Sequence, residues 1–390
     1  MKKPTRVNHP PRVKVPPDNE PLVAPIYQTV KFEFENLEET ERYLRGERPG
    51  FFYSRSSNPT TRQLEQLLAE LQGREDCLVT ASGVGAIAQT LLALTKQGDH
   101  IVCFIETYNP TRYLIRRLLA RFGVSHTMLS IEDLGGVERA LAARPSRLVI
   151  FESPTNPITK VADIAALTRL ARAAGTLTVM DNTFAGFHQH GGYDVDVYLH
   201  SLTKYASGAG DVMGGAVIAR TELIRAMRTE FSVLGGTLDP HAAFLVLRGL
   251  KTYFVRYEAQ SASAMRIAQY LAAHPAIERV HYPGLPTHPQ HALARAQMRD
   301  FGTIVSFDLK GGGATGRRFV DGLELFALTP SLGSTESLVL TPQMMGVREL
   351  SAEQLRLSGI TEGTIRLSIG LEDADDLLED LGRALATAAS

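Results

Sequence analysis

The 390-residue sequence has no tryptophan and only two cysteines, Cys77 and Cys103. Both cysteines stand among apolar residues, so we expect no disulfide framework and a reducing compartment. The chain also lacks an apolar run of about 18 residues, the length that a membrane-spanning helix needs. Its first residues have no apolar stretch typical of a signal peptide. These absences predict a cytoplasmic protein that does not enter a membrane.

An excess of charge of one sign is missing too, since 41 Lys and Arg residues face 42 Asp and Glu residues, a formal net charge of −1. This balance gives no indication of a nucleic-acid or membrane-surface partner. Hydrophobic residues form 44% of the chain, enough for a large core divided into more than one domain. We expect no metal site, because the spacing of the following histidines matches no metal-binding template: His188, His190, His281, His288 and His291.

The order of sequence patterns predicts three parts. Residues 1–59 are interpreted as an N-terminal arm that contacts a neighbouring subunit; the first 21 are rich in proline and basic residues, and a free tail is the alternative for them. Residues 60–250 alternate strand-like and amphipathic stretches, which predicts a mostly parallel sheet with helices on both faces. Residues 251–390 begin with a helical stretch at 259–273 and continue with short strands, which predicts a smaller α+β domain.

Lys204 lies in the most informative segment. A strand-like run at 195–199 ends in hydroxyl residues and then in this lysine, which small residues and glycines follow. A lysine at the end of a buried strand loses hydration, and this favours its neutral amine. A neutral amine attacks carbonyl groups, so the position suits a Schiff base, including one with pyridoxal phosphate. The alternative is a surface lysine after a strand, the commoner fate of a single lysine.

Two upstream apolar runs end in acidic residues, Glu152 and Asp181. A carboxylate at a strand end can hold a proton on a pyridine nitrogen, as a pyridoxal phosphate site requires. Taken alone, Asp181 is equally well explained as a helix cap or a turn residue. Three strands nevertheless deliver polar residues at their carboxyl ends, where open parallel sheets bind ligands.

Donors for a phosphate group are present as well. Small residues at 80–86, with Gly83 among them, precede an apolar stretch that is typical of a helix. Backbone N–H groups at such a helix start can approach an anion closely, and the helix dipole assists. Ser201 and Thr203, close to the lysine, add hydroxyl donors. A short glycine pair is weak support by itself, because many turns look similar.

Together these motifs resemble the Cys/Met metabolism PLP-dependent enzymes, which include cystathionine lyases and synthases, methionine γ-lyase and acyl-homoserine sulfhydrylases. The matching segments run in order from about residue 24 to the C-terminus, among them Tyr-Ser-Arg-Ser-Ser-Asn-Pro-Thr at 53–60, Glu-Ser-Pro-Thr-Asn-Pro at 152–157 and His-Ser-Leu-Thr-Lys-Tyr at 200–205. The resemblance implies an α/β protein of the aminotransferase-like fold type I, with a large domain around a mostly parallel sheet and a smaller α+β C-terminal domain. It also implies pyridoxal 5′-phosphate as the cofactor.

The resemblance implies roles for individual residues. Lys204 would bind the cofactor as a Schiff base and then move protons between substrate carbons. Asp181 would pair with the pyridine nitrogen, and Tyr108 would stack on the ring and assist proton transfer or departure of the leaving group. The residues implied to hold the phosphate are Gly83, Val84, Ser201 and Thr203.

The resemblance also implies how the substrate is bound and how the chains assemble. Arg366 would bind the substrate α-carboxylate, with Ser331 and Asn156 close by, because a guanidinium binds a carboxylate through two parallel hydrogen bonds. Tyr53 and Arg55 match residues that reach the phosphate of a neighbouring subunit. The resemblance therefore implies at least a dimer, and usually a homotetramer built from two dimers.

Positions that differ within the family bear on the reaction. Phe52 stands where lyases and synthases that accept a distal amine place an acidic residue, and this favours an apolar substrate tail. Pro110 stands where methionine γ-lyases carry a cysteine, whereas Glu336 matches an acidic position of the lyases and γ-synthases. The usual His-Pro-Ala-x-Met-Thr-His segment is replaced by Thr-Pro-Gln-Met-Met-Gly at 341–346, and Ala209 replaces a histidine.

The leading hypothesis is a carbon–sulfur lyase of transsulfuration that acts on a sulfur amino acid, methionine or cystathionine. The alternative is a γ-replacement enzyme, either a cystathionine γ-synthase or an O-acyl-homoserine sulfhydrylase. A third hypothesis is a protein that binds the cofactor for regulation. The presence of Lys204, Asp181, Tyr108 and Arg366 together argues against it, because binding alone would not require the whole set.

Overall fold

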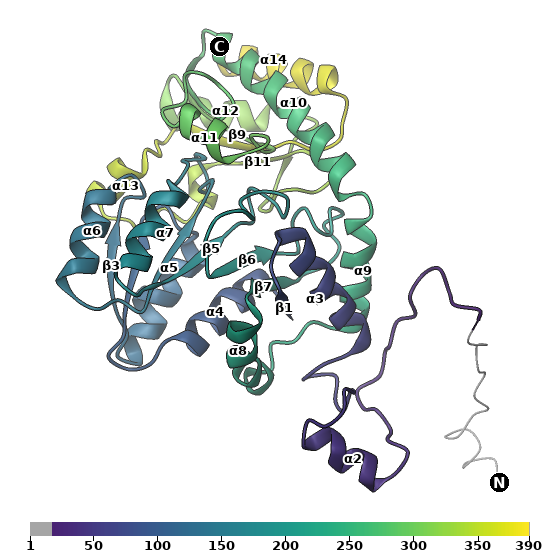
Figure 1. Ribbon diagram of the computed structural model, residues 1–390. Helices are drawn as coiled ribbons and strands as arrows, with labels where there is room; N and C mark the ends of the chain where they lie inside the picture. The colour runs from purple at the N-terminus through teal and green to yellow at the C-terminus, as the bar shows by residue number, and fades with distance from the viewer. Residues whose placement is uncertain (1–17, 390) are drawn as a thin grey trace.

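A computed structural model describes residues 18–389 of the chain. The body contains two sheets, and the segment that carries α2 (Leu37–Leu44) extends away from it (Figure 1). Most of the extended stretch predicted for residues 1–21 lies outside the described residues. Several apolar side chains of the described arm are exposed, with Leu22 fully accessible and Leu37 at 73%.

The larger sheet has seven strands, and most of them run parallel. Their spatial order is β1 (Asp76–Thr80), β7 (Gly215–Ala219), β6 (Val197–Ser201), β5 (Leu177–Asp181), β4 (Leu148–Glu152), β2 (His100–Phe104) and β3 (Ser125–Leu129). β7 pairs antiparallel with β1 and with β6, whereas the strands from β6 to β3 are mutually parallel. The prediction of a mostly parallel sheet is confirmed.

Helices cover both faces of this sheet. One face packs against α3 (Pro59–Gln72), α6 (Leu134–Ala143), α7 (Ile164–Ala173) and α9 (Pro240–Leu250). The other face packs against α4 (Gly83–Leu94), α8 (Thr221–Leu234) and η1 (Leu114–Leu119), a π-helix that continues α5 (Asn109–Tyr113). Side chains alternate along a strand, so Ile150 and Phe151 of β4 enter the two opposite cores.

The smaller sheet has five strands and lies in the C-terminal part of the chain. Its order is β10 (Ala327–Leu328), β11 (Leu338–Leu340), β12 (Thr364–Ser368), β9 (Ile304–Leu309) and β8 (Ile277–His281). All pairs except β10–β11 are antiparallel. The helices of this part are α10 (Tyr253–Ala273), α11 (His291–Gln297), α12 (Gly312–Asp321), η2 (Pro342–Met344), α13 (Ala352–Ser358) and α14 (Ala374–Ala389).

α10 links the two cores and starts earlier than the predicted 259. Its first turns bury Tyr253 and Tyr257 in the core of the large sheet, whereas Ile267 and Leu271 belong to the core of the small sheet. Burial of these aromatic rings explains why a helix forms before the region with an evident helical pattern. The division of the chain into domains at residues 59 and 250 stays a prediction.

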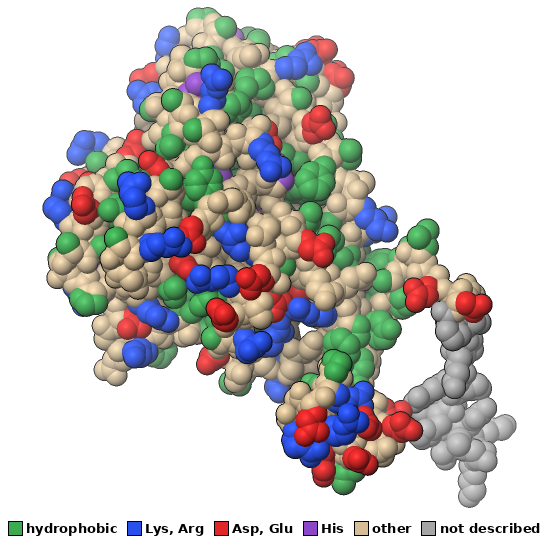
Figure 2. All heavy atoms as spheres, in the orientation of Figure 1, with side chains coloured by type: hydrophobic (Ala, Val, Ile, Leu, Met, Phe, Trp, Pro, Cys, Tyr) green, Lys and Arg blue, Asp and Glu red, His purple; other side chains and the backbone are tan. Residues whose placement is uncertain are grey.

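The surface is mixed in charge. Figure 2 shows basic and acidic side chains interspersed over the visible face of the body, in keeping with the net charge of −1. Within residues 18–389, no helix is both long and apolar enough to cross a membrane. In the same part of the chain, no group of three or more His, Cys, Asp or Glu side chains could hold a metal ion.

Candidate active site

Three neighbouring parallel strands end together at one edge of the large sheet. β4 ends at Glu152, β5 at Asp181 and β6 at Ser201, and the pairing sets Glu152 opposite Asp181. A cavity of about 460 Å³ opens at this edge. It is lined by the following predicted site residues: Gly83, Val84, Tyr108, Asn156, Asp181, Ser201, Thr203, Lys204, Ser331 and Arg366.

Lys204 follows β6 and reaches across to the C-terminal part of the chain. Its Nζ donates a hydrogen bond to Ser331 Oγ at 2.7 Å. Burial, and secondly the positive charge of Arg366, lowers the pKa of Lys204 to about 8, against the opposing effect of Asp181. A substantial fraction of this amine is therefore neutral near pH 8 and can act as a nucleophile or base.

Arg366 lies on β12 with its guanidinium buried. Nη1 donates to Asn156 Oδ1 at 2.9 Å and Nη2 donates to the backbone carbonyl of Ser331 at 2.6 Å. Nε is buried and has no hydrogen-bond partner among the described residues. A buried N–H without an acceptor costs free energy, so this guanidinium is suited to an anion that enters the cavity. Burial lowers the pKa of Arg366 to about 10, which still leaves it charged at neutral pH.

The two carboxyl groups at the strand ends have different partners. Asp181 Oδ1 accepts from the backbone N–H of Thr183 at 3.0 Å. Glu152 accepts from the backbone N–H of Tyr108, and this contact fixes the loop that carries the tyrosine. Burial raises the pKa of Asp181, although Thr183 opposes the effect, and burial followed by the charge of Asp181 raises the pKa of Glu152 well above its usual value.

Tyr108 stands at the cavity wall and is 41% exposed. Burial, followed by the charges of Glu152 and Asp181, raises the pKa of its phenol. The hydroxyl therefore keeps its proton at neutral pH and can donate it. The ring, held by the backbone contact to Glu152, offers a flat apolar face to a planar ligand.

The start of α4 faces the same cavity. Ser82 caps the helix by accepting from the N–H of Gly85 at 3.0 Å. A Cβ on Gly83 would lie 2.8 Å from the Cβ of Ser201, so only glycine lets this turn approach the end of β6. Backbone N–H groups of a first helical turn thus lie beside the Ser201 hydroxyl, and Thr203, whose hydroxyl bonds the backbone of Gly214, lines the same cavity, which suits a phosphate.

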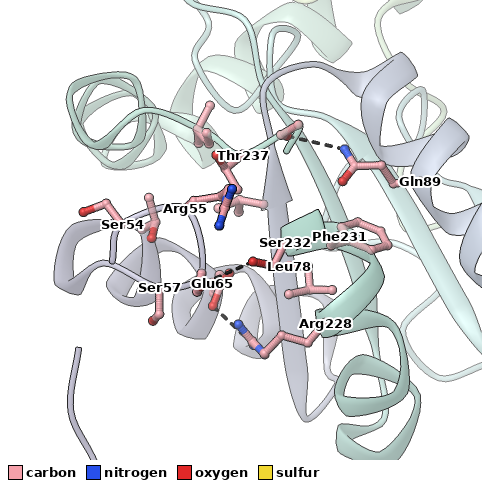
Figure 3. A pocket seen from close by; sticks show the side chains of 15 residues that line it. Ser54, Arg55, Ser57, Glu65, Leu78, Gln89, Arg228, Phe231, Ser232 and Thr237 are labelled. Atoms are coloured by element: carbon pink, nitrogen blue, oxygen red, sulfur yellow. Dashed lines mark hydrogen bonds and ion pairs between the residues drawn. The ribbon is translucent and has the colours of Figure 1, made fainter. Parts of the chain in front are cut away.

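Tyr53 and Arg55 are not brought into this cavity. They precede α3, and the Arg55 guanidinium lies 5.6 Å from the centre of the Tyr53 ring. Figure 3 shows Arg55 in a different pocket, which Ser232 and Thr237 also line. In one chain, therefore, these two residues do not reach the Lys204 cavity.

Two positions singled out for specificity also lie outside the cavity lining. Phe52 packs near Phe34 and Tyr43, with ring centres 6.2 Å apart in both pairs. Glu336 is exposed. Sequence reasoning missed several residues that do line it, namely Met213, Pro330, Leu340, Met344 and Met345. The only signal for two of them was the unusual Met-Met-Gly segment at 344–346.

The comparisons with known proteins agree with this geometry. A family model described as "Cys/Met metabolism PLP-dependent enzyme" matches residues 9–386. The chain belongs to this family. It is 40% identical over 369 residues to an L-methionine gamma-lyase of Fusobacterium nucleatum, with 93% of both chains covered. It is 39% identical to an O-succinylhomoserine sulfhydrylase of Pseudomonas aeruginosa over 363 residues, 93% of this chain and 90% of the relative.

Solved structures place the fold in the same family. A cystathionine gamma synthase of Xanthomonas oryzae superposes with a TM-score of 0.89 and 38% identity, with 94% of each chain covered. The prediction of a fold type I enzyme that uses pyridoxal phosphate is confirmed. The residues of the cavity fit this cofactor, because a partly neutral lysine, a half-buried carboxyl group, an aromatic face and the start of a helix border one space.

Proposed function

We propose that this family member is a carbon–sulfur lyase that cleaves sulfur-containing L-α-amino acids. One observation carries the proposal: a partly neutral lysine and a guanidinium with a free buried N–H are joined through the same residue, Ser331. An amino acid that places its carboxylate on Arg366 brings its Cα towards Lys204. The cavity of about 460 Å³ leaves room for the side chain beyond these anchors.

The proposed roles follow from the contacts. Bound pyridoxal phosphate supplies an electron-withdrawing ring that makes the substrate Cα–H acidic. Lys204 would hold the cofactor and would then remove the Cα proton and move protons between the substrate carbons, as loss of a group from Cγ requires, and Asp181 would keep a proton on the pyridine nitrogen. Tyr108, protonated because its pKa is raised, gives a proton to the departing sulfur. Gly83, Val84, Ser201 and Thr203 hold the phosphate, and Arg366 with Asn156 holds the substrate carboxylate.

In γ-elimination the carbon–sulfur bond breaks, the sulfur leaves as a thiol, and water releases ammonia and a 2-oxo acid.

The alternative is γ-replacement, in which a thiol or sulfide takes the place of the leaving group. It is supported by the relatives that carry out sulfhydrylation and γ-synthesis, which resemble the chain almost as closely as the lyase does.

For the assembly we propose a homotetramer of two dimers, in which Tyr53 and Arg55 complete the phosphate site of a neighbouring chain. Support comes from their position outside the cavity of their own chain and from the apolar side chains exposed on the arm. We also propose a cytoplasmic location, which the two buried, unpaired cysteines support.

The deciding experiment incubates the cofactor-loaded protein with L-methionine and separately with L-cystathionine, and identifies the keto acid by mass spectrometry. Formation of 2-oxobutanoate with release of a thiol supports γ-elimination. Pyruvate from cystathionine would instead mean β-cleavage. If neither acid forms, but O-acyl-homoserine and cysteine give cystathionine, then the replacement reaction is correct and the lyase proposal is wrong.

A further inference from the structure

Residues 341–349, three of which line the cavity, are far from Lys204 in the sequence. They connect β11 to α13 and include the short helix η2. Met344, Met345 and Gly346 line the cavity, together with Leu340 at the end of β11. None of these four residues carries a charge, and Gln343 beside them is exposed and does not line the cavity.

A single buried guanidinium fixes this segment to the loop that carries Tyr108. Arg112 is only 5% exposed. Its Nη1 donates to the backbone carbonyls of Ile105, at 2.8 Å, and Thr107. Its Nε pairs with Glu349 at 2.8 Å, and its Nη2 donates to the carbonyl of Gly346 at 3.2 Å. The same side chain thus holds the strand-end loop on one side and residues 346–349 on the other.

Asn109 makes the second attachment. Its Nδ2 donates to the carbonyl of Gly346 at 3.1 Å. Gly346 has a φ of +66°, and a Cβ at this position would lie 2.1 Å from Asn109 Nδ2. The backbone of the segment therefore packs directly on the residue after Tyr108, and no side chain can be inserted between them. This fixes where Met344 and Met345 meet the cavity.

The charged side chains that line the cavity come from elements other than the segment that carries Met344, Met345 and Gly346. Its charged lining residues are Glu152, Asp181, Lys204 and Arg366, and each already contacts a neighbour in the site. The lining residues Met344, Met345 and Gly346 offer thioethers and backbone instead. Methionine side chains adapt in shape and make favourable contacts with apolar and sulfur-containing groups. A charged substrate tail buried against them would lose its hydration without gaining a partner.

We propose that Met344, Met345 and Gly346 form the specificity wall for the substrate side chain, and that this wall selects uncharged thioether tails over tails that carry an amine or a carboxylate. Arg112 and Asn109 are positioning residues that hold the wall against the Tyr108 loop. The inference rests on the proposed function and deepens it by naming the substrate class.

The test uses the cofactor-loaded enzyme and three S-substituted L-homocysteines of similar length, with S-propyl, S-(2-aminoethyl) and S-carboxymethyl groups. The expected kcat/KM is higher for the S-propyl compound than for either charged compound by about tenfold or more. Spectral titration of the bound cofactor gives the same order of affinities without requiring turnover. Equal values for all three compounds would overturn the proposed wall.

Variants separate the wall from its supports. Met345→Glu should improve the relative kcat/KM of the aminoethyl compound by about tenfold. Arg112→Lys retains the charge near Glu349 but cannot reproduce the fork of hydrogen bonds, so it should raise KM for the S-propyl compound and reduce the preference. Gln343→Ala is the matched control and should change neither KM for the S-propyl compound nor the preference among the three compounds. An unchanged preference in both Met345→Glu and Arg112→Lys would contradict the inference.

The two proposals fail in different ways. If no 2-oxo acid forms from any of the three compounds, while the titration still shows the preference for the S-propyl tail, the lyase reaction is wrong and the wall stands. If 2-oxo acid forms at equal rates from all three, the lyase reaction stands and the wall is wrong.

Discussion

Glu152 and Asp181 stand directly opposite each other in the parallel pairing of β4 and β5, so a buried and a half-buried carboxyl group share the end of the sheet. Burial raises the pKa of both, and for Glu152 the neighbouring Asp181 adds to the effect. A carboxyl group whose pKa is raised by folding favours the folded state at low pH, and this contribution disappears as pH rises through the folded-state pKa. The pair therefore destabilises the cofactor-free protein at neutral pH.

Glu152→Gln should stabilise the cofactor-free protein at pH 7 by about 1–3 kcal/mol, because the amide still accepts from Tyr108 N–H but carries no charge to bury. The gain should shrink towards zero as the pH falls below the unfolded-state pKa of a glutamate. Urea unfolding at several pH values measures this difference in the free energy of unfolding between the variant and the wild type. Glu336→Gln, at an exposed position, is the control; a Glu152→Gln protein that is less stable at pH 7 would contradict the prediction.

Replacement of the lysine should remove activity but leave the fold. Lys204→Ala loses the proposed base and the attachment point, so turnover should fall below detection while the circular dichroism spectrum stays unchanged. Borohydride treatment should fix the cofactor to the wild-type chain only, as peptide mass spectrometry would show. Substantial turnover by Lys204→Ala would remove this residue from its proposed role.

The pH dependence of cofactor attachment follows from the pKa of Lys204, lowered to about 8 by burial and then by Arg366. Only the neutral amine attacks the carbonyl, so the attachment rate of the cofactor-free protein should rise with pH and level off above pH 8. Arg366→Gln removes one of the two causes of the lowered pKa, the positive charge near Lys204. The midpoint of the curve of attachment rate against pH should therefore move to higher pH. Stopped-flow absorbance measures both proteins. A midpoint that does not move would show that Arg366 has no electrostatic effect on the lysine.

Asp181 is predicted to act on rate more than on cofactor binding. In Asp181→Asn the amide retains hydrogen bonding but cannot keep a proton on the pyridine nitrogen, so kcat should fall by about 10²-fold or more. Absorbance should show that the cofactor remains bound. If the cofactor-saturated variant kept a rate close to that of the wild type, Asp181 would have a structural role only.

Much of the large-sheet site could be predicted because it is encoded locally. Lys204 and Asp181 follow apolar runs, and parallel strands bring their carboxyl ends to one edge. Gly83 was equally predictable from the small residues around the start of α4. Each of these expectations needed only a strand or helix pattern and the residue that follows it.

The remainder depends on contacts between distant segments. No local pattern indicates that Met344 faces the cavity, because its position is set by Arg112 and Asn109 through the carbonyl of Gly346. Similarly, the sequence near Tyr253 gives little sign that α10 begins there, since the helix is stabilised by rings buried in the other core. Long-range packing decides these features, and a single sequence does not reveal it.

Tyr53 and Arg55 are predicted to serve the active site of another chain. Arg55→Ala should weaken cofactor binding, and Lys204→Ala should be inactive. If Arg55 acts between chains, dissociating and reassembling an equal mixture of the two variants creates hybrid dimers. Each hybrid then has one site with both an intact Lys204 and an intact Arg55 from its partner. With random pairing, about a quarter of all sites in the mixture have both residues intact.

The measurement is the activity of the mixture at limiting cofactor, before and after reassembly, with native mass spectrometry to count the hybrids. Activity should rise with the fraction of hybrids. A residue acting within its own chain gives a different result, because each hybrid would then combine one site lacking Lys204 with one lacking Arg55. In that case reassembly would leave the activity at the average of the two variants, and the proposed exchange of phosphate ligands between chains would be wrong.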